Sequence, residues 1–170
     1  MRILFCLLLV PLLLHGQEKR PIAPRSRRLS AKEMTTMADV VALGNVSDMK
    51  SEWNADKSRI YTRVRIEVRE FLKGGTPGRP LVLRIAGGEV GDVGEIYSGV
   101  AHFRPGEEVV VFAKGRPGED GEVVGGAQGR VPVETDAVTG EKTVQGGVQI
   151  DEFRSDVKSA AQAARPGEKK

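Results

Sequence analysis

Cysteine is almost absent from this sequence, which has 170 residues and a single cysteine, Cys6. One cysteine excludes a fold stapled by intramolecular disulfides, and it excludes a zinc site made of clustered thiolates. Histidine is also scarce, because only His15 and His102 are present. A catalytic arrangement of the Ser-His-Asp or Cys-His type would depend on these two positions, and the sequence contains no nucleophile elbow. We therefore expect a protein that is not an enzyme and that uses no cofactor.

A short apolar run lies near the start of the chain. Residues 3–14 are apolar and follow Arg2, a pattern typical of a secretory signal peptide. The run is shorter than the roughly 20 apolar residues that a transmembrane helix needs. We expect residues 1–16 to be a signal peptide that is cleaved near Gly16–Gln17, because Gly16 is the small residue at its exit. An uncleaved anchor is the alternative.

Cleavage at this position predicts a secreted or periplasmic protein without a transmembrane segment. Both Cys6 and His15 would leave with the signal peptide, so the mature chain would have no thiol and His102 as its only histidine. A hydrolase centred on His102 is an alternative to the interpretation of this residue as a surface or packing side chain.

Positive charge is concentrated ahead of the predicted domain. The whole chain has a net charge of +3, and removal of the signal peptide with Arg2 leaves +2. Residues 17–32 carry +5, whereas residues 33–170 carry −3. Because Pro21 and Pro24 interrupt the basic stretch, we predict that residues 17–29 form a disordered linker. Contact of this basic segment with anionic lipid, polysaccharide or nucleic acid is the alternative.

Hydrophobic periodicity predicts a mainly β domain over residues 30–164, with a disordered tail at residues 165–170. Strict alternation of apolar and polar residues over 60–68 predicts a long strand with one wet face, and the out-of-phase Phe71 predicts a bulge near its end. Pro132 predicts an edge strand, because proline cannot donate to a ladder. Loops are predicted at 47–59 and 87–94. Further strands are predicted at 39–46, 81–85, 109–113, 123–124, 130–133 and 142–144.

Two helices are predicted at the ends of this domain. Ser30 and Glu33 have the spacing of a capping box, which predicts a short helix over residues 31–37. Apolar residues at helical spacing after Asp151 predict an amphipathic helix over residues 151–164 that packs on the predicted barrel. The 21 glycines and 9 prolines are typical of the many turns that connect short strands.

Aromatic residues are few, with one Trp, two Tyr and five Phe. Tyr61 lies on the wet face of the long strand between arginines, and such a pattern is typical of surfaces that stack on and pair with acidic polymers. A merely solvated face, or one covered by the C-terminal helix, is the alternative. The candidate binding residues are the aromatic and arginine side chains Trp53, Tyr61, Arg63, Arg65, Arg69 and Tyr97.

The sequence also contains a group of loop acids and a match to a glycosylation sequon. The loop acids Glu89, Asp92 and Glu95 could supply oxygen ligands to Ca²⁺, although no EF-hand pattern is present, and solvated loop acids are the alternative. Asn45-Val46-Ser47 matches a glycosylation sequon, and its place at a predicted strand end favours a chance match. No metal site is predicted from any other cluster of ligands.

The order of several segments is similar to that of known secreted proteins. These segments cover about residues 30–133 and are 38–46, 72–74, 91–94, 103–112 and 126–133. They resemble tissue inhibitors of metalloproteinases and netrin-like modules, and also a group of secreted bacterial proteins. The resemblance implies a small OB-like barrel of five to six strands with flanking helices. The zinc-chelating N-terminal cysteine of those inhibitors has no counterpart in the mature chain, so their mechanism does not carry over.

The sequence therefore predicts a secreted, non-enzymatic binding module for a protein or an extracellular polymer such as a polysaccharide. A protease inhibitor that acts through the loops of the barrel is the alternative. The secreted location and the nearly neutral mature charge argue against nucleic acid as the ligand. The oligomeric state is left open.

Overall fold

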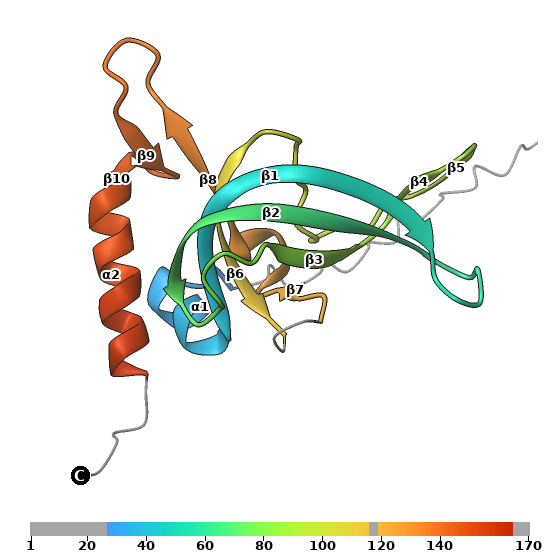
Figure 1. The fold of residues 1–170 in the computed structure, drawn as a ribbon, viewed down its shortest axis with the longest axis horizontal. Coiled ribbons are helices and arrows are strands. Elements are labelled where there is room, and N and C mark those ends of the chain that lie inside the picture. Colours follow the sequence, from blue (N-terminus) through green and yellow to red (C-terminus); the bar gives the residue numbers. More distant parts are fainter. Residues whose placement is uncertain (1–26, 116–118, 165–170) are drawn as a thin grey trace, which may run out of the picture.

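The computed structural model describes residues 27–115 and 119–164, which form a mainly β fold with two α-helices (Figure 1). The predicted signal peptide, residues 17–26 of the predicted linker and the predicted tail at 165–170 lie outside the described residues. In chain order the elements are α1 (Ala31–Met37), β1 (Val40–Trp53), β2 (Ile60–Lys73), β3 (Leu81–Ala86), β4 (Gly88–Val90), β5 (Val93–Glu95), β6 (Glu108–Lys114), β7 (Glu122–Val123), the 3-10 helix η1 (Gly126–Gly129), β8 (Arg130–Thr135), β9 (Lys142–Val144), β10 (Val148–Gln149) and α2 (Ile150–Ala163).

The main sheet is antiparallel and has the strand order β10-β9-β8-β6-β1-β2-β3, with β7 paired to β6. Its outermost strands, β10 and β3, do not pair with each other in the described part of the chain. Beyond β3, a single bridge joins Leu83 to Gly121, just before β7. The predicted mainly β class with two helices is confirmed, whereas the described sheets are not closed into a barrel.

The β1–β2 hairpin is longer than the sequence predicted. Residues 47–53, predicted as loop, continue β1 as far as Trp53, which pairs with Ile60. Most of their side chains are polar, and the apolar ones, Met49 and Trp53, do not alternate with them at a period of two, so the sequence carries no strand signal there. The strand forms because the long partner β2 satisfies its backbone hydrogen-bonding groups along its whole length. The register shifts between Val41 and Ala42, and this shift leaves Leu72 of β2 without a partner residue on β1. It agrees with the predicted bulge at the end of β2.

The predicted alternation in β2 is confirmed. Ile60, Val64 and Ile66 are fully buried on one face, whereas Arg63 and Arg65 are exposed on the other. The segment predicted as a glycine-rich loop is instead largely the β4–β5 hairpin, whose strands pair from Gly88 to Glu95. This hairpin could not be predicted from the sequence, because its strands are only three residues long and contain glycine, which disfavours strands.

Strand β8 lies between β6 and β9, so the prediction of an edge strand from Pro132 is wrong. The physical reason is that β8 uses its two halves for different partners. Arg130, Val131 and Pro132 pair with β6, and the ladder with β9 begins only at Val133. Proline is therefore tolerated at the last residue of the β8–β6 ladder, directly before the β8–β9 ladder begins.

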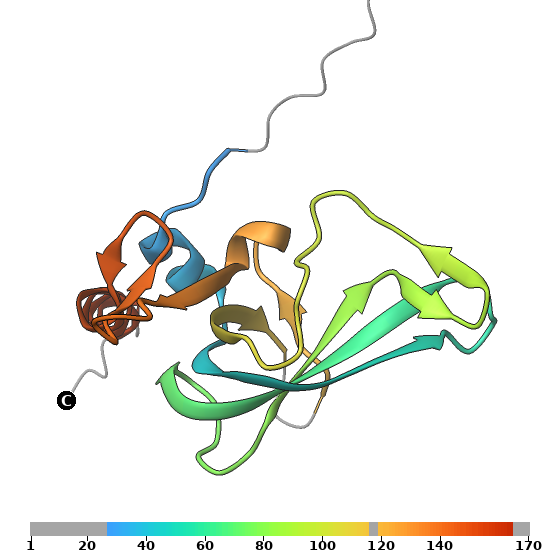
Figure 2. The same cartoon turned by 90° about the horizontal axis from the view of Figure 1, so that it is seen from above.

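Both predicted helices are present and lie together at one end of the molecule, which we call the helical end (Figures 1 and 2). The capping box of α1 is formed, because the Ser30 hydroxyl accepts from the Glu33 N–H and the Glu33 carboxylate accepts from the Ser30 N–H. Just before it, the Leu29 N–H donates to Gln128 Oε1 over 2.7 Å. Residues 27–29, which the sequence places in the linker, thus include a contact with the domain.

Helix α2 packs through one apolar stripe and one ion-paired edge. The ring of Phe153 meets that of Phe112 edge to face, with centroids 6.4 Å apart. Val157 is fully buried in the same apolar cluster. On the neighbouring edge of the helix, the Glu70 carboxylate of β2 accepts a hydrogen bond from Arg154 and forms an ion pair with Lys158. These contacts connect α2 to the β1–β2 hairpin.

A second apolar cluster lies under the long strands, and its members include Val64, Leu83 and Phe103. It extends toward the end of the sheet that lies away from the helices, where the β1–β2 turn and the β4–β5 hairpin project (Figures 1 and 2). We call this the distal end. The sheet thus presents an outer face, which carries Tyr61 and Arg63, and an inner face, which carries Thr62 and Val64.

Candidate functional site

The three candidate arginines on the outer face of β2 are all paired within the chain. Arg63 lies 2.8 Å from Asp120, and Arg65 lies 3.0 Å from Glu67. Arg69 pairs with Glu108, which also accepts from Lys142. Each of these guanidinium groups therefore already has a carboxylate partner within the described residues.

Tyr61 is likewise engaged by the chain itself. The guanidinium carbon of Arg84, in the neighbouring strand β3, lies 3.7 Å from the centroid of the Tyr61 ring. This cation–π contact covers one face of the Tyr61 ring. Arg84 could not be found from the sequence, because only the pairing of β2 with β3 brings it beside Tyr61, and this register has no local signal.

The remaining candidates, Trp53 and Tyr97, lie toward the distal end. Trp53 is the last residue of β1 and is half-buried. The Tyr97 hydroxyl donates to Glu95 and accepts from Arg59, both over 2.9 Å. The structure therefore places the predicted residues in two separate settings, with the arginines along the outer face and Tyr97 beside a pocket on the inner face.

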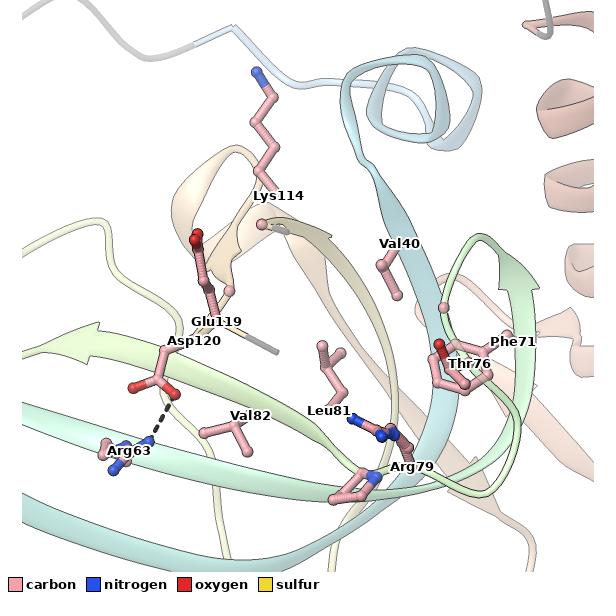
Figure 3. Close-up of a pocket in the computed structure, with 14 residues that line it drawn as sticks. Val40, Arg63, Phe71, Thr76, Arg79, Leu81, Val82, Lys114, Glu119 and Asp120 are labelled. Atoms are coloured by element: carbon pink, nitrogen blue, oxygen red, sulfur yellow. Dashed lines mark hydrogen bonds and ion pairs between the residues drawn. The ribbon is translucent and has the colours of Figure 1, made fainter. Parts of the chain in front are cut away.

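One cavity, of about 280 Å³, lies where Arg63 meets the segment that precedes β7 (Figure 3). The Arg63–Asp120 ion pair stands at one side of it, and Leu81 and Val82 provide apolar wall. Cations and acids both reach this cavity, among them Arg79, Lys114 and Glu119. Its charges are mixed in sign, so its chemistry does not single out one class of ligand.

A larger cavity, of about 510 Å³, lies on the inner face near the distal end, and we call it the distal pocket. Its apolar lining comes from strands far apart in the sequence and from the segment after β5. Val64 of β2, Ile85 of β3 and Phe103 are all buried side chains of this lining. Ile96, directly after β5, belongs to the same lining and yet is 92% exposed, so it forms part of the rim.

A chain of hydroxyl groups crosses one wall of the distal pocket. Thr62 Oγ1 donates to the Gly87 carbonyl over 2.7 Å, and Ser51 Oγ lies 2.9 Å from Thr62 Oγ1. A carbonyl can only accept, so the Thr62 proton is committed to Gly87 and Ser51 must be the donor to Thr62. The Ser51 oxygen is then left with lone pairs, and this part of the wall is a hydrogen-bond acceptor.

The acidic residues of the distal pocket are Glu89 and Glu95, on either strand of the β4–β5 hairpin. Glu95 Oε2 accepts from the Ile60 N–H over 3.1 Å as well as from Tyr97. His102 also lines the pocket, but no hydrogen bond joins it to another side chain within the described residues. Over the same residues no three His, Cys, Asp or Glu side chains are grouped so that they could hold a metal ion, and this holds for Glu89, Asp92 and Glu95.

The glycosylation sequon lies in the middle of the sheet. Asn45 of β1 is paired with both β2 and β6, and the Ser47 hydroxyl donates to the Arg65 carbonyl. This position is consistent with a chance match, because glycosylation acceptors belong to surface loops.

Comparisons with known proteins add no family to this description. No protein-family model matches the sequence, and no curated protein matches it in a sequence search. None of the helices within the described residues is both long and apolar enough to cross a membrane.

Proposed function

We propose that this protein is a secreted, non-enzymatic binding module that holds a partner protein at the distal pocket and its rim. The observation that carries the proposal is the exposure of Ile96, a large apolar side chain, beside a cavity with an apolar lining. Val93 in the adjacent strand β5 is also exposed, at 48%. An exposed apolar side chain at the edge of a concave pocket is typical of protein-binding surfaces.

The state of the outer face favours a protein over an extracellular polymer. Binding of an acidic polymer depends on cations that are free to replace its counterions. Arg63, Arg65 and Arg69 each have an acidic partner within the chain, and Tyr61 is covered by Arg84. The inner face keeps its apolar pocket open, so it provides the better docking surface.

We also propose that the fold is an OB-like barrel of the netrin-like kind. The support is the arrangement of β7, which pairs with β6 while the preceding Gly121 reaches β3. Gly121 donates its N–H to the Val82 carbonyl, and its carbonyl accepts from the Arg84 N–H, both over 2.8 Å. Strands β1, β2, β3, β7 and β6 would close into a ring if this bridge were extended by a few residues.

The proposal is tested by capture of secreted proteins on the immobilised full chain. Wild type is compared with Ile96→Asp and with the matched control Val138→Asp. Val138 is equally exposed, at 94%, but lies in the turn between β8 and β9, far from the pocket. We expect the same partner protein on wild type and on the control, and at least a tenfold loss on Ile96→Asp. Equal capture by Ile96→Asp, or bound material that survives prior protease treatment of the extract, contradicts the proposal.

A further inference from the structure

We infer that the distal pocket receives the side chain of a lysine or arginine from an extended segment of the partner protein. This inference rests on the proposed function and adds the chemistry of the partner. Three features carry it: the apolar lining of the pocket, the direction of its hydrogen bonds, and the charge of the hairpin that borders it.

The apolar lining suits the stem of a long basic side chain. Val64, Ile85 and Phe103 are buried side chains that line the pocket, and Met49 adds a flexible thioether. Lysine and arginine bury their methylene stems along apolar surface while the charged head reaches a polar rim. A short polar side chain would leave this lining uncovered, and a purely aliphatic one would leave the polar groups of the wall without a partner.

The hydroxyl groups in the wall of the pocket are left as hydrogen-bond acceptors. The Thr62 hydroxyl donates to the Gly87 carbonyl, and the Ser51 hydroxyl donates to Thr62. The Tyr97 hydroxyl donates to the Glu95 carboxylate. The acceptors that remain are the lone pairs of Ser51, the carboxylate of Glu89 and the second oxygen of Glu95, and the imidazole of His102 also lines the pocket. An ammonium or guanidinium group has only donors, so it complements this wall.

The hairpin beside the pocket carries charge of one sign. Residues 88–95 contain Glu89, Asp92 and Glu95 and no basic residue. The cation Arg59 donates to the Tyr97 oxygen, which in turn donates to Glu95. A basic side chain of the partner would thus meet a surface that attracts it.

The free edge of β5 favours an extended partner segment. In the described residues β5 pairs only with β4, so its other edge has unpaired backbone groups. An extended peptide can add to such an edge through main-chain hydrogen bonds and place alternate side chains into a neighbouring pocket. Ile96, at the end of β5, would then flank the entering side chain.

The inference is tested by NMR titration of the full chain with the blocked peptide Ac-Ala-Val-Lys-Val-Ala-NH2. A second peptide carries norleucine in place of lysine, which keeps the stem and removes the charge. We expect the lysine peptide to shift the resonances of Thr62, Val64 and Ile85, with a dissociation constant about tenfold lower than that of the norleucine peptide. The variant E89Q should weaken the lysine peptide about threefold, whereas the control E119Q, at the other cavity, should not.

Equal affinities of the two peptides, or shifts confined to residues outside the pocket, overturn the inference. The proposed function stands in that case if capture of the partner still depends on Ile96. Loss of the Ile96 dependence overturns the proposed function, whatever the peptides do. The spectra of E89Q and E119Q also report whether each variant is folded, so a loss of binding through unfolding is recognised directly.

Discussion

Arg63 Nη2 lies 2.8 Å from Asp120 Oδ1, so the outer face of β2 is joined to the segment that precedes β7. The two residues are 57 positions apart in the sequence. The hydrogen bond raises the pKa of Arg63 above its ordinary value. An arginine that looks available for a ligand in the sequence is therefore a partner of the chain's own acid.

Reversal of this pair should be tolerated only when both charges are exchanged. Arg63→Glu places two carboxylates side by side and should lower the urea midpoint of unfolding. The double variant Arg63→Glu with Asp120→Arg should recover most of the wild-type midpoint, because the attraction is restored. Capture of the partner protein should be the same for wild type, the single variant and the double variant. A single variant that loses the partner would return the binding site to the outer face.

The capping box of α1 should give the protein a defined loss of stability in acid. The Ser30 backbone N–H, the Ser30 hydroxyl and Arg27 together lower the pKa of Glu33 from 4.5 to about 2. A depressed folded-state pKa stabilises the protein above the unfolded value, and this contribution disappears as the pH falls from 4.5 to about 2. Glu33→Gln should therefore be less stable than wild type at pH 7, and the two unfolding curves should converge toward pH 2.

The matched variant for this prediction is Ser30→Ala, which removes the hydroxyl partner and leaves Glu33 in place. It should lower the free energy of unfolding by about 1 kcal/mol at pH 7. It should also flatten the dependence on pH over the same window. A Glu33→Gln chain that stays less stable by a constant amount down to pH 2 would contradict the proposed origin of the effect.

At Gly44, β1 and β2 approach too closely for a side chain to fit. A Cβ atom there would lie 2.3 Å from the Glu67 carbonyl oxygen. We expect Gly44→Ala to lower the free energy of unfolding by about 1–3 kcal/mol, because the strands must separate. The control is Gly94→Ala, whose Cβ would meet its nearest atom, Glu89 Cγ, at 3.4 Å. Chemical denaturation measures both, and an equal loss in the two variants would be inconsistent with the close approach.

The contact of Phe153 with Phe112 should decide whether α2 stays on the sheet. Phe153→Ala removes the ring that meets Phe112 and should cost about 2 kcal/mol, less than for a fully buried ring because Phe153 is half-buried. Ser159→Ala, on the exposed side of α2, should change the free energy by less than about 0.5 kcal/mol. Hydrogen exchange of α2 should accelerate only in the first variant. Unchanged protection in Phe153→Ala would show that the ion pairs of Glu70 suffice.

Local patterns in the sequence determined the parts of the fold that depend on neighbours along the chain. The alternation from Ile60 to Val68 predicted β2 because burial in a strand has a period of two. The spacing of Ser30 and Glu33 predicted the start of α1 because both capping bonds lie within one turn. The absence of thiols in the domain likewise followed from the position of Cys6 alone.

Only the tertiary structure decided what the side chains of those elements do. The partners Asp120 and Glu108 of the arginines, and Arg84 above Tyr61, lie on other strands that the topology brings alongside β2. The distal pocket depends in the same way on β1, β2, β3 and the β4–β5 hairpin. Strand register decides which of these side chains come into contact. Because register is a property of two paired segments, the sequence of either segment alone does not encode it.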